Sequence, residues 1–90
     1  MPLSFSIFSL DNFTVRGLEY SKTKSGTPYA IVNFENVAKG EYLIALDFDL
    51  IISKGGYRSK LQIGRVYNVT LEHRAAYSYI LLLWYKEVQK

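Results

Sequence analysis

The side chains that could serve as acid, base or metal ligand are few in this 90-residue chain. His73 is the single histidine, and a lone histidine at the end of a strand is more often an exposed turn residue than a general base. Asp47 and Asp49 would share one face of a strand, where paired carboxylates can hold a cation or act as acid and base. No other carboxylate or histidine stands close to them in the sequence, so an exposed, solubilising face is the better interpretation. We predict a protein that is not an enzyme, with no catalytic residue, metal site or cofactor.

Cations interleaved with tyrosines offer a different chemistry, because charged groups neutralise phosphates while ring faces stack on any base. One such segment surrounds a turn at Gly26 and contributes Arg16, Tyr20, Lys22, Lys24 and Tyr29. In an extended strand, Arg16 and Tyr20 project to the same side and can meet one ligand strand. An ordinary solvated hairpin, kept soluble by its lysines, is the alternative interpretation of this segment alone.

A second basic stretch favours nucleic acid. Residues 50–71 hold no Asp or Glu, and they contribute Lys54, Tyr57, Arg58, Lys60 and Arg65. Acidic residues gather in the preceding stretch instead, at Glu35, Glu41, Asp47 and Asp49. With a net charge of +3 and eight tyrosines, the chain should carry a basic, aromatic side and an acidic side.

The elements that must position these side chains are β-strands, because apolar residues recur with a period of two. The clearest runs are Leu3, Phe5, Ile7, then Tyr42, Ile44, Leu46, Phe48, Leu50, then Tyr67, Val69, Leu71. We expect strands over residues 3–20, 29–35, 42–50, 66–73 and 77–87. The first should be bulged at Asp11–Asn12 and bent at Gly17. Residues 53–64 carry no strand period, and we expect a short helical turn or an open loop there.

Five short strands in 90 residues fit an oligonucleotide-binding (OB) barrel, an SH3-like barrel or a truncated sandwich. We predict an all-β fold, a five-stranded OB-like barrel with a projecting basic hairpin, in one domain spanning residues 1–90. The chain has no cysteine and its N-terminus lacks a basic region, so we expect a cytoplasmic location. The longest apolar stretch, residues 77–85, is about half the ~20 residues of a membrane-spanning helix, so no membrane association is expected.

The last strand is apolar on both faces. One face carries Tyr79, Leu81, Leu83 and Tyr85, and the other carries Ile80, Leu82 and Trp84. A loop or the N-terminal segment could cover the second face, or a second copy of the chain could. Since so small a domain has little spare chain, we predict a homodimer interface of Ile80, Leu82 and Trp84.

The order and spacing of several motifs resemble the single-stranded DNA-binding proteins of filamentous bacteriophages over nearly the whole chain. These motifs are Phe13-Thr14-x-Arg16, Gly26-x-Pro28-Tyr29, Gly40-Glu41-Tyr42 and Tyr67-x-Val69-x-Leu71, followed by a final apolar strand. The sequence departs from the family at residues 73–76, which replace a longer glycine-containing hairpin tip, and in its more basic residues 53–65.

This resemblance implies an OB-like barrel, a symmetric homodimer and cooperative coating of single-stranded DNA during replication. By the same resemblance, Arg16 contacts phosphate, Tyr29 contacts DNA after the turn, and Tyr77 presents a ring to DNA near the dimer axis. Lys22 and Lys24 stand where the family has a basic residue.

We therefore expect sequence-nonspecific binding of single-stranded DNA, with RNA as a variation that the sequence does not distinguish. Charge would come from Arg16, Lys22, Lys24, Lys54, Arg58, Lys60 and Arg65, and stacking surfaces from Tyr20, Tyr29, Tyr57 and Tyr77. Two alternatives stay open. One is a small β-barrel adaptor whose tyrosines line a peptide groove, and the other is a structural protein that assembles through its last strand.

Overall fold

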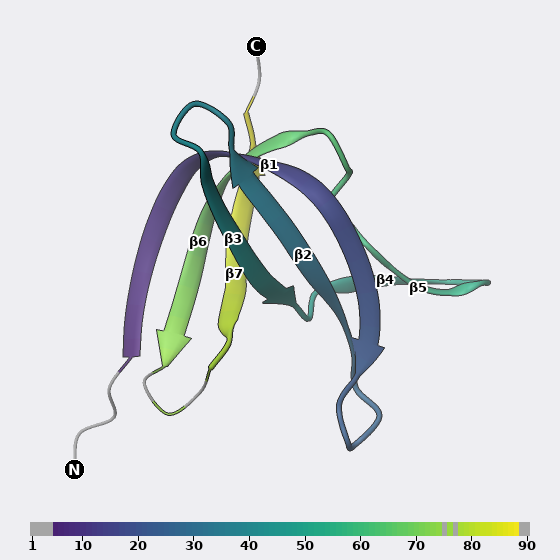
Figure 1. Cartoon of the computed structure of the whole chain (residues 1–90). Helices are drawn as coiled ribbons and strands as arrows, with labels where there is room; N and C mark the ends of the chain where they lie inside the picture. Colours follow the sequence, from purple (N-terminus) through teal and green to yellow (C-terminus); the bar gives the residue numbers. More distant parts are fainter. Residues whose placement is uncertain (1–4, 75, 77, 89–90) are drawn as a thin grey trace.

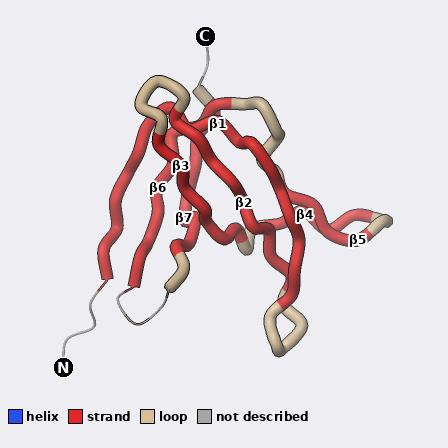
Figure 2. The backbone as a smooth tube through the Cα atoms, viewed as in Figure 1, coloured by secondary structure: helices blue, strands red, loops and turns tan. Residues whose placement is uncertain are grey.

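A computed structural model describes residues 5–74, 76 and 78–88, and over these residues the chain is all-β (Figures 1 and 2). The strands are β1 (Phe5–Lys22), β2 (Pro28–Asn36), β3 (Glu41–Asp47), β4 (Leu50–Ser53), β5 (Gly56–Ser59), β6 (Val66–Arg74) and β7 (Ile80–Glu87). A closed barrel has the strand order β1, β2, β3, β7, β6, and β4 pairs with β5 in a separate hairpin. The predicted all-β, five-stranded OB-like class is confirmed. No helix among the described residues is long and apolar enough to span a bilayer.

The barrel closes because β1 is long enough to pair with two neighbours. Its first half runs antiparallel to β6 from Phe5 opposite Arg74, and its second half runs antiparallel to β2 up to Lys22 opposite Pro28. Figure 1 shows β1 arching over the top of the barrel between these two partners. On the other side, β3 meets β7 in parallel where Leu46 is opposite Leu81.

The bend in β1 is where the sequence predicted it. The pairing with β6 shifts register between Leu10 and Phe13, and Asn12 adopts a φ of 62°, a left-handed conformation that asparagine tolerates better than most residues. The backbone N–H of Asn12 donates a 3.1 Å hydrogen bond to Oδ1 of Asn68. A second shift lies between Val15 and Gly17, next to the predicted bend.

The core is built from the inward faces of all five barrel strands and from Leu61 in the connection after β5. Its fully enclosed members include Val15, Val32, Phe34, Val69 and Leu71. Phe13 meets Phe34 edge-on, with ring centroids 6.3 Å apart. This packing fixes the barrel wall from which the hairpins project.

The alternating apolar run in β3 predicts that Tyr42 and Ile44 face the core, and this prediction is wrong. Tyr42 and Ile44 are 76% and 58% exposed, whereas Ala45 and Asp47 on the alternate face are buried. The expected strand over residues 42–50 also stops at Asp47, before β4 begins at Leu50. The small side chain of Ala45 fits the crowded interior, and Asp47 finds hydrogen-bond donors there, so the core accepts the face that carries this carboxylate.

Over residues 53–59 the chain is neither the helical turn nor the open loop that we expected for residues 53–64, because β4 and β5 form a hairpin that stands out from the barrel (Figure 1). Residues 60–64 follow this hairpin as loop and turn. Ser53 is opposite Gly56, with Lys54 and Gly55 in the turn. Gly56 has a φ of +121°, which side-chain-bearing residues rarely adopt, so glycine is required at this position.

The last strand does not present the predicted dimer face. Leu71 is opposite Leu82 and Thr70 is opposite Trp84, so Leu83 is an extra residue that reverses the alternation. Leu82 is buried and Ile80 packs against the core, whereas Trp84 is 59% exposed. The three residues therefore do not share one outward face, and the homodimer stays a prediction.

Candidate nucleic-acid interface

Two hairpins enclose an open cleft of about 430 Å³. The β1–β2 hairpin contributes Tyr20, Ser21, Lys22 and Pro28, and the β4–β5 hairpin contributes Gly55, Gly56 and Tyr57. In Figure 1 the first hairpin points downward and the second points to the right, both from the lower right part of the barrel. The fold thus brings Tyr20 and Lys22 from the first basic segment to Tyr57 from the second.

The turn of the β1–β2 hairpin is closed by its own threonines. The N–H of Thr23 donates to the carbonyl of Thr27 at 2.9 Å, and the N–H of Thr27 returns a bond to Oγ1 of Thr23 at 3.1 Å. Gly26 supplies the positive φ of 89° that the turn needs. These bonds hold Lys22 and the exposed Lys24 at the end of the hairpin.

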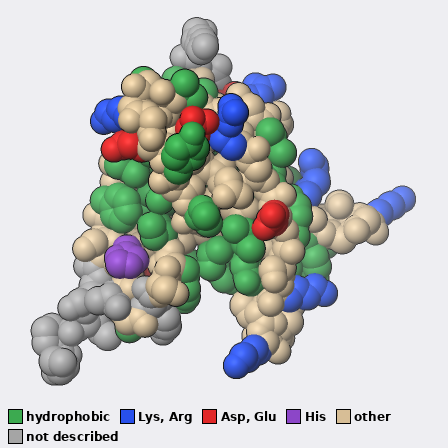
Figure 3. Space-filling view, viewed as in Figure 1, with side chains coloured by type: hydrophobic (Ala, Val, Ile, Leu, Met, Phe, Trp, Pro, Cys, Tyr) green, Lys and Arg blue, Asp and Glu red, His purple; other side chains and the backbone are tan. Residues whose placement is uncertain are grey.

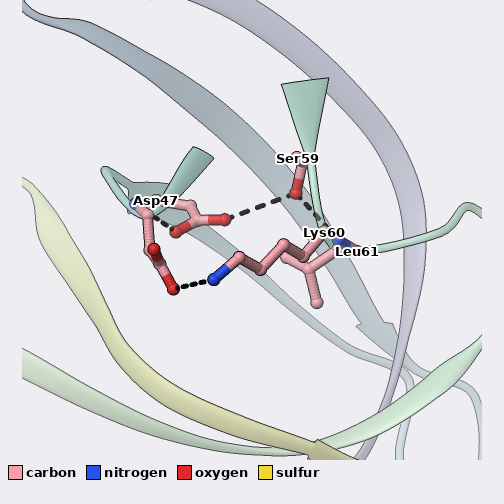
Figure 4. A network of polar contacts seen from close by, with 5 residues as sticks. Asp47, Ser59, Lys60 and Leu61 are labelled. Atoms are coloured by element: carbon pink, nitrogen blue, oxygen red, sulfur yellow. Dashed lines mark hydrogen bonds and ion pairs between the residues drawn. The ribbon is translucent and has the colours of Figure 1, made fainter. Parts of the chain in front are cut away.

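The β4–β5 hairpin is anchored to the barrel through Ser59. The backbone N–H of Ser59 donates to the Tyr20 hydroxyl at 2.9 Å, and the Ser59 hydroxyl donates to Oδ2 of Asp47 at 3.3 Å. The N–H of Leu61 donates in turn to the Ser59 hydroxyl oxygen at 3.0 Å (Figure 4). One wall of the cleft is therefore tied to the other by the side chain of Tyr20.

Asp47 is a structural residue here, so the prediction that it shares an exposed acidic face with Asp49 is wrong. Asp47 is 1% exposed, and its carboxylate accepts hydrogen bonds from Ser59 and from the backbone N–H of Asp49. Burial raises the pKa of Asp47 above its ordinary value, against the opposing effect of these hydrogen bonds. Lys60 pairs with Asp49 at 2.9 Å on the outside of the network.

Three of the candidate cations are engaged in ion pairs. Arg16 lies 3.2 Å from Glu35, Lys60 pairs with Asp49, and Arg65 lies 2.8 Å from Glu87. The remaining candidates have no ion pair with any described residue: Lys22, Lys24, Lys54 and Arg58. All of these lie on the two hairpins, where Figure 3 shows Lys and Arg side chains at separate places on the surface.

Arg16 and Tyr20 do not project to the same side as expected. Tyr20 is opposite the buried Ala30 and turns toward Ser59, whereas Arg16 reaches Glu35 on the outer face of β2. The register shift between Val15 and Gly17 inserts Arg16 as an extra residue, and this breaks the alternation on which the prediction depended.

The candidate tyrosines fall into different environments. Tyr20 and Tyr57 are 49% and 44% exposed and line the cleft. Tyr29 lies outside the cleft lining and packs on Phe48, with ring centroids 5.1 Å apart and the planes tilted by 33°. Tyr77 lies outside the described residues. The structure therefore gathers two of the four stacking candidates at one place.

The catalytic and metal candidates do not come together. His73 is exposed on β6, and Glu72 beside it pairs with Arg74 at 3.3 Å. Among the described residues, no group of three or more acidic or histidine side chains is placed to hold a metal ion.

Sequence reasoning missed several residues that line the cleft, namely Ser21, Pro28, Gly55 and Gly56. The Gly55-Gly56 pair was the available signal, because two glycines between extended runs are typical of a tight hairpin turn. In comparisons with known proteins, the chain matches no family model, no curated protein and no solved structure.

Proposed function

We propose that this protein binds single-stranded DNA without sequence preference, through phosphate contacts and tyrosine stacking. The observation that carries the proposal is the cleft between the two hairpins, which combines exposed rings of Tyr20 and Tyr57 with Lys22. The resemblance to phage single-stranded DNA-binding proteins adds a role in phage or plasmid replication. The expected location, the cytoplasm, which for a virus is that of the host, is part of the same proposal.

The unpaired cations support this proposal on energetic grounds. A lysine that has no acidic partner can approach a phosphate without first breaking an ion pair, and it releases a counterion from the strand when it does so. Lys54 at the tip of the β4–β5 hairpin and Lys24 at the tip of the β1–β2 hairpin both lack an acidic partner within residues 5–74, 76 and 78–88. Because these lysines lie on two different hairpins, they can contact successive phosphates of a flexible single-stranded DNA that follows the protein surface.

The cleft lining supports the absence of sequence preference. The described residues of the lining include no Asn, Gln or Arg, whose planar groups read a base edge with two hydrogen bonds, and the polar side chains that remain are Ser21, Lys22 and the two tyrosines. Ring faces and a methylene-rich lysine stem accept every base. The Tyr20 hydroxyl is already engaged by Ser59, so it leaves the ring face as the contact surface.

A second candidate function is favoured by one observation, the exposed apolar side chains on the outer face of β3. Tyr42 and Ile44 are largely exposed, and Phe48 just beyond the strand is 42% exposed. Apolar surface of this kind is typical of protein-binding sites. A protein-interaction adaptor would use this outer face rather than the cleft.

The test is a fluorescence-anisotropy titration of a labelled oligo-dT at ~50 and ~200 mM salt, with a duplex of equal length as control. We expect tight binding of the single strand, weak binding of the duplex and steep weakening with salt. An oligo-U arm of the same length measures the DNA preference over RNA. Absence of binding to every strand at ~50 mM salt would refute the proposal and favour the adaptor.

A further inference from the structure

We propose that the cleft between the β1–β2 and β4–β5 hairpins is a preformed subsite for one unstacked nucleobase, held against the rings of Tyr20 and Tyr57. This inference rests on the proposed function and adds to it a discrete base-binding position. It separates two kinds of single-strand binder, those that hold only phosphates and those that also take up a base.

The cleft is set up before any ligand arrives. The Tyr20 hydroxyl accepts the Ser59 N–H, which fixes the position of β5 relative to the ring of Tyr20. The Ser59 hydroxyl is bound to the buried Asp47 at the end of β3, so β5 is held from a second direction. A site whose walls are already fixed spends less binding free energy on ordering itself.

The size and lining of the cleft suit a flat, uncharged ring. Its volume of about 430 Å³ falls within the range of small-molecule sites in proteins. At Gly55 and Gly56 the wall is bare backbone, and a Cβ built at either position meets no atom within 4 Å. The cleft is therefore open at these glycines, and nothing there prevents close approach of a base.

Charge around the cleft selects the chemical class of the ligand. Lys22 is part of the lining, and Lys54 adjoins Gly55 in the hairpin turn. A base that enters the cleft brings its flanking phosphates toward these unpaired ammonium groups. The ligand is thus a nucleotide within a single strand, since the bases of a duplex are stacked and cannot enter without unpairing.

The test compares two oligonucleotides of equal length and charge, oligo-dT and a fully abasic oligo-deoxyribose phosphate. Full removal of the bases matters because a nonspecific binder would otherwise slide to the next base. For the wild-type protein we expect the abasic strand to bind about 5- to 140-fold more weakly, the range that one stacked base contributes.

Two variants locate the base. Tyr57→Ala removes one ring, and Gly55→Leu adds a side chain to the cleft lining at a position where a Cβ meets no atom within 4 Å and φ is not in the left-handed region. Both should lose most of the preference for oligo-dT over the abasic strand and keep the phosphate-driven affinity for both. The matched controls are Tyr42→Ala, an exposed tyrosine on β3, and Ala38→Leu in the exposed β2–β3 turn, which should keep the preference.

The outcomes separate the subsite from the proposed function. Equal wild-type affinity for the two strands would overturn the subsite together with the stacking part of the proposed function, and it would leave only phosphate-driven binding of single strands. A wild-type preference that Tyr57→Ala and Gly55→Leu both retain would also overturn it, because the base is then bound elsewhere. If neither strand binds at ~50 mM salt, the proposed function fails and the subsite fails with it.

Discussion

The salt dependence of single-strand binding is the sharpest quantitative consequence of the ion pairs. Of the seven candidate cations, Arg16, Lys60 and Arg65 are paired with carboxylates, which leaves four without an acidic partner in the described part of the chain. For single strands the slope of log K against log salt is about −0.7 per neutralised phosphate. Four contacts give a slope of about −2.8, whereas seven would give about −4.9.

These slopes are readily distinguished by anisotropy titration. Between ~50 and ~200 mM salt, a slope of about −2.8 weakens binding about 50-fold, and a slope of about −4.9 weakens it about 900-fold. Lys54→Ala should reduce the steepness by about 0.7, since it removes one contact. Arg16→Ala should leave the slope unchanged, because Glu35 already neutralises that guanidinium.

The control for Lys54→Ala is Lys39→Ala, which removes the same charge from the exposed β2–β3 turn, away from both hairpins. It should leave the slope at its wild-type value. A wild-type slope near −4.9, or an equal loss of steepness in the Lys39 and Lys54 variants, would refute the assignment of phosphate contacts to the unpaired hairpin cations.

Four further predictions concern stability and assembly. Tyr20→Phe removes the acceptor of the Ser59 N–H and should cost about 1 to 3 kcal/mol in urea unfolding, whereas Tyr57→Phe, whose hydroxyl has no hydrogen bond to a described residue, should cost little. Tyr29→Ala should lower the free energy of unfolding by about 0.5 to 1.5 kcal/mol through the lost ring contact with Phe48, in addition to the effect of the lost buried area. The affinity for oligo-dT should stay near that of the wild type. A large loss of affinity with stability intact would show that Tyr29 contacts DNA. Burial raises the pKa of Asp47, so the folded chain keeps the Asp47 proton at a pH where the unfolded chain, with a pKa of about 3.9, has lost it. The free energy of unfolding of the wild type should therefore fall as the pH rises from about 4 through the raised pKa. The fall is measured relative to Asp47→Asn, which cannot titrate at this position. Trp84→Lys changes an exposed side chain of β7 and should shift the predicted homodimer toward monomer in sedimentation velocity. A wild-type chain that sediments as a monomer at every concentration would contradict the dimer.

The parts of the fold that could be predicted are those with a local cause. A broken alternation between Leu10 and Phe13 required a bulge, and the bulge lies at that place. The face of β3 could not be predicted in this way, because Tyr42 and Ile44 are as apolar as Leu43 and Ala45 beside them. Which of the two sets faces inward depends on the space left by the facing strands, and on Ser59, a hydrogen-bond partner of Asp47 that follows twelve residues later.

The candidate site was predicted in composition and not in geometry. Tyr20, Lys22 and Tyr57 were expected to bind and do line one cleft. Their meeting depends on the β4–β5 hairpin, whose four-residue strands are too short to show a period. Arg16 pairs with Glu35 and Arg65 with Glu87 because of the register between neighbouring strands. Bulges shift this register, and a single sequence does not specify it.

The double pairing of β1 sets the order in which the protein can fold as it is synthesised. The hairpin of β1 with β2 joins neighbours in the sequence, whereas the first half of β1 waits for β6, with contacts such as Ser9 to Thr70 that span 61 residues. Contacts of such separation form slowly, because a long loop must close before they contribute. Tyr20, Asp47 and Ser59 are all synthesised before β6, so the bonds that shape the cleft can form while the barrel is still open. Until closure, the free edges of β1 and β3 are open to pairing with another molecule, and the edge of β3 is the last to be covered, because its partner β7 is the last strand to be synthesised.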